Sequence, residues 1–409
     1  TDLALGDNWR LRHNTRYDRV DGRLSTMYAA WWDGFVDAAG ASDPNGQYLN
    51  RWWYGSNDSG RFTATEVLAE GRVETAGITH TLLVGVDNMT NRQSIDSPSE
   101  VLATPLNVYT PVYGTFREPA MSDGTPDVND VARFGLTVQD QLTLAERLHV
   151  RLGLRRDRVS NAVVGGGKEL DWVTTGNVGV VYEVVNGFAP YLSYAQSFTP
   201  VSGTTFSGDL FKPRLGEQIE AGFKWEAQTA PAQFSAAYYT LTENNRLTAD
   251  PVNVGYSVQL GQADIQGVEL EARSEDGPWT TLGSYTWTHA RASADAWGSA
   301  LNADQQLEGI PEHQASVWTT HDFTGYGLPG VTLGGGVRYV GRVGDGTGNV
   351  FVPPVTLFDA MGAYTMGQWR FAVNVNNLTD KPYIATCLAR GDCWFGQRRT
   401  LSVTAGFTY

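Results

Sequence analysis

The chain has 409 residues and a formal net charge of −14; such an acidic protein repels phosphate backbones, so we expect no nucleic-acid partner. It contains 46 glycines, 13 tryptophans, 18 tyrosines and 16 phenylalanines, which suits many strands, tight turns and aromatic girdles. No run of 18 apolar residues occurs, which excludes a transmembrane helix but not a membrane protein built from alternating strands.

Apolar and polar residues alternate along several segments of the chain. In chain order, the long ones are 8–19, 129–143, 147–158 and 278–290. Each has about the length of a tilted membrane strand, whereas strands of soluble sandwiches usually have five or six residues. The alternation is clearest at the end, where every second residue from Leu401 to Tyr409 is apolar or aromatic. These segments predict membrane-spanning β-strands.

The connections between these segments alternate between short and long. The short turns are Asp21-Gly22, Ala145-Glu146, Asn186-Gly187, Asp276-Gly277-Pro278, Leu328-Pro329-Gly330 and Met366-Gly367. The long loops are 33–58, 88–128, 159–169, 199–214, 290–311 and 378–396. Outer-membrane barrels have short periplasmic turns and long external loops. We therefore predict an all-β fold, a transmembrane antiparallel up-and-down β-barrel with about 17 strands.

The direction of the first strand bears on how much of a barrel the sequence contains. The last strand follows a long loop, so it runs toward the periplasm, and counting backward gives the same direction for segment 8–19. A complete single-chain barrel has an even number of strands and begins on the periplasmic side. We therefore expect one barrel domain over residues 1–409 whose N-terminal part is missing.

Several stretches resemble TonB-dependent receptors, especially the ferrichrome-type members of the siderophore branch. The stretches are HTLLVGVD at 80–87, NVYTPVYG at 107–114, GLTVQDQ at 135–141 with LGLR at 152–155, PYLSYAQSFTP at 190–200, FKP at 211–213 with EQIEAG at 217–222, GVELEA at 267–272, NNLTDKPY at 376–383, and Cys387 through Cys393-Trp394-Phe395-Gly396 to Thr400. Their number, order and spacing carry the resemblance over nearly the whole chain.

The resemblance implies an outer-membrane barrel of about 22 strands, plugged by an N-terminal globular domain that carries the TonB box. Neither the plug nor the box is found in this sequence, and about five strands would also be absent. The implied ligand is a ferric siderophore, with no resident cofactor. The implied partners are outer-membrane lipid and, through the missing plug, TonB–ExbB–ExbD; we expect a monomer.

Aromatic residues in or beside the long loops are the candidate ligand contacts. They are Trp52, Tyr109, Tyr113, Phe198 and Trp394. Tyr109 matches a position where ferrichrome-type receptors have a ligand-contacting tyrosine. Aromatic rings can bury the surface of a bulky chelate while phenol hydroxyls bond its carbonyl groups. The alternative is that these rings pack loops onto the rim or form the interfacial girdle, and at most one of Trp52 and Trp53 can face the lumen.

Cys387 and Cys393 lie close together near the C-terminus. In a cytosolic enzyme such a pair would raise metal or redox chemistry, but in an exported protein it is most simply one disulfide. The resemblance places this pair in an extracellular loop. Ferrichrome-type receptors have an aromatic ligand contact directly after the first cysteine, where this sequence has Leu388. That departure weakens an assignment to ferrichrome itself.

The remaining polar residues predict no catalytic chemistry. The six histidines lie at no metal-ligand spacing, so we expect no protein-bound metal, and no nucleophile constellation indicates an enzyme. Charged residues on the polar face of the strands predict a hydrated lumen with ion pairs. They are Arg10, Arg12, Arg16, Arg151, Arg155, Glu220, Lys224, Glu269, Glu271 and Arg338.

Taken together, the patterns and the resemblance predict an outer-membrane receptor and transporter for ferric siderophores, energised by TonB in the full-length protein. Two alternatives remain open at this point. One is a passive porin-like barrel without a plug. The other is a TonB-dependent receptor for a different cargo, such as cobalamin, haem or a glycan.

Overall fold

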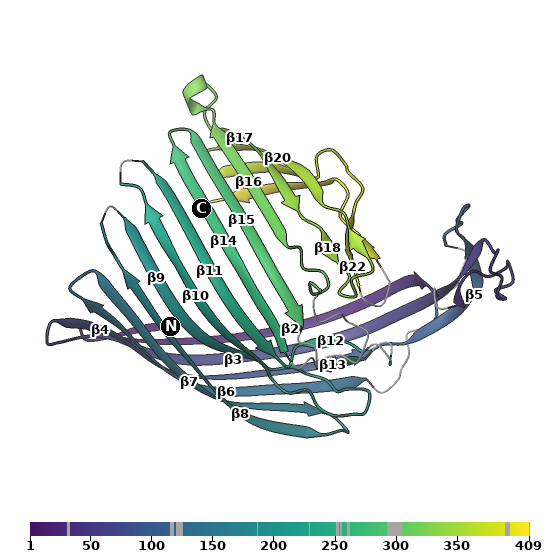
Figure 1. The fold of residues 1–409 in the computed structure, drawn as a ribbon, viewed down its shortest axis with the longest axis horizontal. Coiled ribbons are helices and arrows are strands. Elements are labelled where there is room, and N and C mark those ends of the chain that lie inside the picture. The colour runs from purple at the N-terminus through teal and green to yellow at the C-terminus, as the bar shows by residue number, and fades with distance from the viewer. Residues whose placement is uncertain are drawn as a thin grey trace.

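The protein, described here by a computed structural model, is a curved antiparallel β-sheet that forms an open barrel wall (Figure 1). The structure describes residues 1–30, 33–114, 118–119, 126–185, 187–228, 230–250, 253, 256–259, 262–292, 305–388 and 393–408. Over these residues, no helix combines the length and the apolar character that crossing a bilayer requires.

The main sheet contains 18 strands. They are β1 (Asp2–Leu5), β2 (Trp9–Ala29), β3 (Tyr48–Thr75), β4 (Ile78–Asp96), β5 (Ser99–Asn107), β6 (Asp127–Leu144), β7 (Leu148–Val163), β8 (Lys168–Tyr182), β9 (Phe188–Thr199), β10 (Arg214–Glu226), β11 (Ala232–Asn244), β14 (Gln262–Asp276), β15 (Trp279–Ala292), β16 (His313–Asp322), β17 (Val331–Val340), β20 (Val355–Met366), β21 (Trp369–Asn376) and β24 (Thr400–Phe407). Both β4 and β5 pair with β3 as one passage across the wall, so the described residues make 17 passages, as predicted.

Three small hairpins lie in the connections at the long-loop end. They are β12 (Leu247–Ala249) with β13 (Ser257–Gln259), β18 (Val343–Gly344) with β19 (Phe351–Val352), and β22 (Ile384–Cys387) with β23 (Cys393–Phe395). At the opposite end, a 3-10 turn, η3 (Thr324–Tyr326), connects β16 to β17. Within the described residues β1 pairs only with β2, and β24 only with β21, so the wall is not closed.

The predicted alternation of side chains produces an apolar outward face. Val84, Val138 and Leu154 face one another across β4, β6 and β7, and 48%, 52% and 60% of their surfaces are exposed. Burying an aliphatic side chain of this size is worth about 1.5–3 kcal/mol. Rows of exposed aliphatic residues are therefore stable when lipid covers them, which explains why these strands form a membrane wall.

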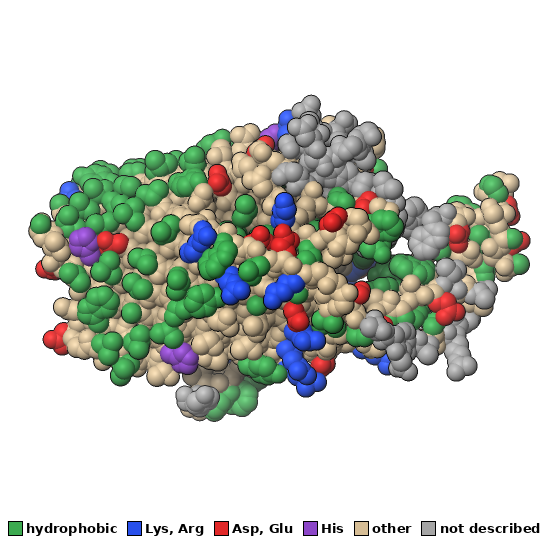
Figure 2. All heavy atoms as spheres, turned by 90° about the horizontal axis from the view of Figure 1, so that it is seen from below, with side chains coloured by type: hydrophobic (Ala, Val, Ile, Leu, Met, Phe, Trp, Pro, Cys, Tyr) green, Lys and Arg blue, Asp and Glu red, His purple; other side chains and the backbone are tan. Residues whose placement is uncertain are grey.

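The outward face changes character along the strands. In Figure 2, hydrophobic side chains are spread over the short-turn end, on the left, and arginine and lysine side chains gather nearer the long-loop end. The pairing register sets Arg19, Arg61 and Arg92 side by side on β2, β3 and β4. This row of charges marks the level at which the apolar band ends.

The turn predicted at Asp21-Gly22 was wrong. Both residues lie inside β2, opposite Ser59 and Asp58 of β3. Asp-Gly favours a tight turn locally, but the cross-strand pairing along β2 and β3 outweighs that preference. The actual short turn precedes β2, at residues 6–8. Strand β2 consequently runs toward the long loops, not toward the periplasm as predicted, and β1 runs the opposite way.

Several loop boundaries also differed from the prediction. The expected long loop 159–169 is only the short connection 164–167, because β7 and β8 extend farther. The expected loop 33–58 ends where β3 begins at Tyr48. Likewise, β4 and β5 fill the start of the expected loop 88–128. These strands rise above the apolar band, where both faces contact water and the alternation no longer marks the strand ends.

Most other predicted turns and loops are present. Turns occur at Ala145-Glu146, where both residues have positive φ, and at Gly277, Gly330 and Gly367. Asn186 lies outside the described residues. Loop 199–214 agrees with the connection between β9 and β10. Residues 293–304 and 389–392 of the predicted loops 290–311 and 378–396 lie outside the described residues, and the described residues 305–311, 378–388 and 393–396 belong to connections between wall strands. The connections after β11 and β17, which contain small hairpins of their own, were not predicted.

Candidate functional site

The charged residues predicted to face the lumen all lie on the same face of the sheet, which is the face opposite the rows of aliphatic residues. Arg10 pairs with Glu70 at 3.2 Å, and Arg338 Nη2 donates to Asp359 Oδ1 at 3.0 Å. Such pairs contribute little where water reaches them. They nevertheless give the wall a polar, largely neutralised inner surface, which a hydrated lumen requires.

A denser ion network lies on the inner face of β4, β6 and β7. Arg155 Nη2 lies 2.6 Å from Asp87 Oδ1 and 2.6 Å from Asp157 Oδ1, and Arg133 Nη2 lies 3.1 Å from Asp87 Oδ2. Asp157 is fully buried. A Cβ atom on Gly135 would lie 2.0 Å from Arg155 Nη2, so this glycine makes room for the guanidinium. These motif residues therefore build the wall.

Trp52 and Trp53 point to opposite faces of β3, as adjacent strand residues must. Trp53 is 1% exposed, and its indole Nε1 donates to Ser25 Oγ at 3.0 Å. Trp52 lies opposite Tyr28 in the pairing register, with ring centroids 5.9 Å apart. Trp52 and Glu70 are separated by an even number of residues on β3, so their side chains lie on the same, inner face of the strand. Of the two tryptophans, Trp52 is therefore the one on the lumen side.

Tyr109 and Tyr113 follow β5 and are 72% and 77% exposed. The backbone at Tyr109 is fixed because Asn107 Oδ1 accepts a hydrogen bond from Tyr109 N at 2.9 Å. Tyr113 lines a cavity of about 360 Å³ between the ends of β2, β3 and β5, together with Met27, Trp53 and Leu106. Tyr109 is not among the lining residues. Met27 and Trp53 have the opposite parity to the inner-face pair Arg10 and Glu70, so this part of the lining belongs to the outward face of the sheet, and sequence reasoning missed its aliphatic members.

Phe198 and Trp394 do not line this cavity. Phe198 pairs with Leu215 and is separated from the outward-facing Leu192 by an even number of residues on β9. Its side chain therefore lies on the outward face, which does not favour contact with a ligand in the lumen. Trp394 is 47% exposed on hairpin β22–β23, and neighbouring Phe395 is 83% exposed. The structure thus brings Trp52 and Tyr113 to one strand end and leaves Trp394 on another loop.

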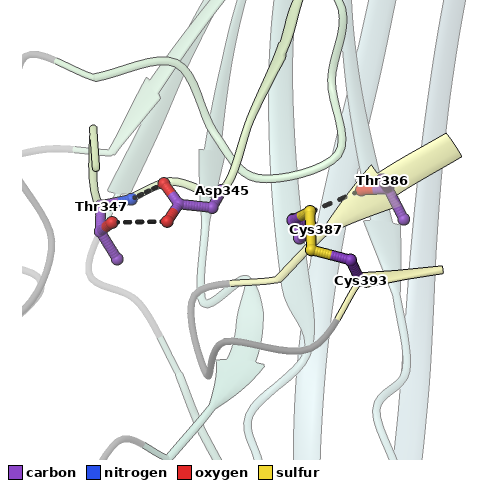
Figure 3. The surroundings of a disulfide bond; sticks show 5 residues. All are labelled: Asp345, Thr347, Thr386, Cys387 and Cys393. Carbon is purple, nitrogen blue, oxygen red and sulfur yellow. Dashed lines mark hydrogen bonds between the residues drawn. A yellow bond between two sulfur atoms is a disulfide. The ribbon is translucent and has the colours of Figure 1, made fainter. Parts of the chain in front are cut away.

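The predicted disulfide is present between Cys387 and Cys393, with an S–S distance of 2.04 Å (Figure 3). Among the described residues, no group of three or more His, Cys, Asp or Glu side chains could hold a metal ion.

The NNLTDKPY stretch is a loop anchor. Asn377 is 2% exposed with φ 50°; its backbone N donates to Asp359 Oδ1 at 2.8 Å, and its Nδ2 donates to Gln397 O at 3.1 Å. Asp380 accepts a hydrogen bond from Arg398 Nη2 at 2.7 Å, and this guanidinium lowers the pKa of Asp380 to about 2. The motif thus ties the connection after β21 to the start of β24.

A one-sheet wall with an aliphatic outer face and an ion-paired inner face defines an outer-membrane β-barrel protein. A family model described as TonB dependent receptor-like, beta-barrel matches residues 1–378. The chain belongs to this family, whose members are receptors and transporters of the outer membrane and are not an enzyme class.

Two relatives with established names cover nearly all of the chain. It is 33% identical over 433 residues to the ferrichrome outer membrane transporter/phage receptor of Escherichia coli (strain K12), covering 100% of this chain and 57% of that protein. It is 32% identical over 411 residues to the ferrioxamine B receptor of Salmonella typhimurium (strain LT2), covering 97% and 56%. The chain therefore spans little more than half the length of these relatives.

Solved structures have the same fold. The closed form of the ferric-catecholate import receptor Fiu from E. coli K12 superposes with a TM-score of 0.81 at 18% identity, covering 99% of this chain and 62% of that chain. The siderophore receptor PiuA from Acinetobacter baumannii gives a TM-score of 0.78 at 19% identity, covering 100% and 63%. At such identities the likeness concerns the fold alone.

Proposed function

We propose that this chain forms the barrel wall and outer rim of a receptor that takes up ferric siderophores across the outer membrane. The observation that carries the proposal is the exposure of aromatic side chains in the outer loops, namely Tyr109, Tyr113 and Trp394. Aromatic rings that project from a rigid wall can bury the apolar edges of a chelate. The names of the two relatives, a ferrichrome transporter and a ferrioxamine B receptor, agree with such a ligand.

The ligand is cargo, and the chain's contribution is binding and passage; we propose no catalytic role and no resident cofactor. The iron arrives already chelated, so the protein needs contacts to the organic shell of the chelate and no metal ligands of its own. Trp52, Tyr109, Tyr113 and Trp394 are the proposed contacts, because each lies at the loop end of the wall. Phe198 is left out of this set because of its outward parity.

Transport would need parts beyond the wall described here. Among the described residues nothing pairs with the outer edges of β1 and β24, and such edges cost several kcal/mol per orphan backbone group in lipid. We propose that a longer protein supplies the strands that close the barrel and a plug that contacts TonB–ExbB–ExbD. A wall with a polar lumen and no plug would instead conduct small solutes passively.

Growth under iron limitation tests the proposal. A strain lacking the complete gene would be given one ferric siderophore at a time, including ferrichrome and ferrioxamine B. The proposal expects loss of growth on at least one chelate, restored by the gene on a plasmid and abolished when TonB is deleted. Unchanged growth on every chelate would refute the siderophore assignment, and uptake that persists without TonB would favour the porin alternative.

A further inference from the structure

The disulfide hairpin β22–β23 is packed against a second hairpin of the outer loops. Cys387 is 3% exposed and forms a buried cluster with Val343 of β18 and Val352 of β19, which are 3% and 4% exposed. Figure 3 shows the disulfide beside the connection of β18 and β19, with Asp345 and Thr347 drawn as sticks. One face of the disulfide hairpin is therefore fixed by apolar packing.

The segment 305–309 touches both hairpins. Gly309 N donates to Gly344 O of β18 at 3.3 Å. A Cβ atom on Gly309 would lie 3.4 Å from Thr386 Oγ1 of β22, and one on Gly348 would lie 2.9 Å from Gln305 Cδ. Gly309 has φ +73°, a left-handed conformation that glycine adopts without strain. A methyl group at Gly309 would thus reach van der Waals contact with the disulfide hairpin, and the left-handed backbone conformation is what disfavours a side chain at this position.

The same segment is anchored on the inner face of the barrel wall. Gln306 Oε1 accepts a hydrogen bond from Ala290 N at 3.0 Å, and its Nε2 donates to Thr288 O at 2.9 Å. Leu307, 7% exposed, packs into a buried cluster with Ala263 and Ala290, which are both 0% exposed. Because these wall residues are small, they leave a recess that one leucine side chain fills.

Gly309 contacts the face of the disulfide hairpin that carries an exposed aromatic ring. Thr386 is paired with Trp394 in the register of β22 and β23, and Cys387 is paired with Cys393. Side chains of adjacent residues alternate between faces of a hairpin. Trp394 therefore shares the face of Thr386, against which Gly309 lies, while the cysteines belong to the face packed on Val343 and Val352.

We propose that Gln306–Gly309 is a positioning element that holds the disulfide hairpin, and with it Trp394 and Phe395, in a fixed place at the mouth of the barrel, and that this placement sets how tightly a ferric chelate binds. The proposal rests on the proposed function. A hairpin held in place before the ligand arrives loses less conformational freedom on binding, which favours affinity. Leu307 and Gly309 act through the hairpin and need not touch the ligand themselves.

Two readouts on the complete receptor in detergent test the proposal. The first is the rate at which a water-soluble phosphine reduces the Cys387–Cys393 disulfide, which reports how firmly the hairpin is docked. The second is the dissociation constant for ferrioxamine B or ferrichrome, whichever the wild type binds. Leu307→Ala and Gly309→Ala should each speed reduction and weaken chelate binding by about tenfold. Leu307→Met, which refills the recess, should restore both values toward those of the wild type.

Gly208→Ala is the matched control for Gly309→Ala. Gly208 lies in another outer loop with φ +90°, and nothing lies within 4 Å of a Cβ placed there. The substitution adds comparable backbone strain without touching the hairpins, so both readouts should stay at wild-type values.

Three outcomes overturn the positioning role. They are unchanged reduction rates in folded Leu307→Ala and Gly309→Ala, faster reduction with unaltered affinity, and equal effects from Gly208→Ala. Failure of the wild type to bind any ferric chelate would instead overturn the proposed function, and with it the affinity part of this inference; the reduction rates would still decide whether the segment docks the hairpin.

Discussion

At the scale of single residues, Asp157 shows how the inner face tolerates buried charge. Its carboxylate is fully buried and lies within 2.8 Å of Arg155 through both oxygen atoms. Removing one member of such a network leaves an uncompensated charge, which costs about 3–5 kcal/mol. Asp157→Ala should lower the unfolding free energy of the complete receptor by that amount, measured by denaturant unfolding in lipid vesicles. A change under about 1 kcal/mol would show that water solvates the network.

The placement of aromatic residues, in an outer loop or on the outward face of a strand, gives a second prediction at this scale. Tyr113→Ala removes an exposed ring from the outer loop that follows β5 and should weaken chelate binding by about 1–3 kcal/mol, as a central aromatic contact does. Phe198→Ala removes a ring from the outward face and should leave affinity unchanged. Titration calorimetry with the purified receptor measures both. Equal losses in the two variants would contradict this distinction between a loop aromatic and an outward-facing strand aromatic.

Asp380 provides a prediction about pH. The Arg398 guanidinium lowers the pKa of Asp380 from 3.8 to about 2. A carboxyl whose pKa is lower in the folded protein contributes stability above its unfolded value, and that contribution is lost as the pH falls through the folded value. Amide hydrogen exchange of loop 377–383 should therefore be steady from pH 7 to about 4, after allowing for intrinsic rates, and quicken below that.

The matched variant is Asp380→Asn, which keeps the size of the side chain but cannot ionise. Its loop should exchange faster than the wild type at pH 7, and the difference should shrink as the pH approaches about 2. A wild-type transition centred near pH 6 would point to a histidine instead.

At the scale of strands, the alternation of faces predicts opposite effects for neighbouring positions. Val403 is 69% exposed on the outward face of β24, and Thr404 lies on the inner face. Val403→Arg should destabilise assembly in vesicles by about 2–4 kcal/mol if the site lies near the bilayer midplane, whereas Thr404→Arg should be tolerated. Heat-modifiable gel mobility reports the folded fraction. Equal assembly of both variants would contradict a lipid-facing Val403.

Sequence reasoning predicted strands well where one face meets lipid and the other meets water. There, Leu152 and Leu154 alternate with Gly153 and Arg155, and the segment 147–158 matches β7. Above the apolar band both faces of a strand contact water, so the alternation of apolar and polar residues weakens. The predicted boundaries of loop 159–169 were therefore wrong. Asp21-Gly22 failed for a different reason, since a local turn preference was outweighed by long-range pairing.

The candidate site could be predicted only in part. Motif matching located Tyr113 and the disulfide, but the cavity depends on strands far apart in sequence, so Met27 and Leu106 could not be assigned to it. Phe198 could have been excluded, because it lies an even number of residues from the outward-facing Leu192 on one strand. Several motif residues, including Asn377 and Asp87, turned out to hold loops and wall together.

At the scale of the whole molecule, a place in the outer membrane requires one arrangement of the sheet. Its exposed aliphatic rows need lipid, its inner charges need water, and its long connections gather at one end (Figure 1). The membership in a family of outer-membrane receptors follows from the match over residues 1–378. The proposal of siderophore uptake rests in addition on the exposed aromatic residues of the outer loops.

A cysteine scan along β7 of the complete receptor in vesicles tests this arrangement most directly. Each single cysteine would carry a fluorophore, quenched in turn by a lipid-dissolved and a water-soluble quencher. We expect labels at 150, 152 and 154 to respond to the lipid quencher and those at 151, 153 and 155 to the aqueous one. Equal aqueous quenching at all six positions would contradict a sheet that stands in a bilayer.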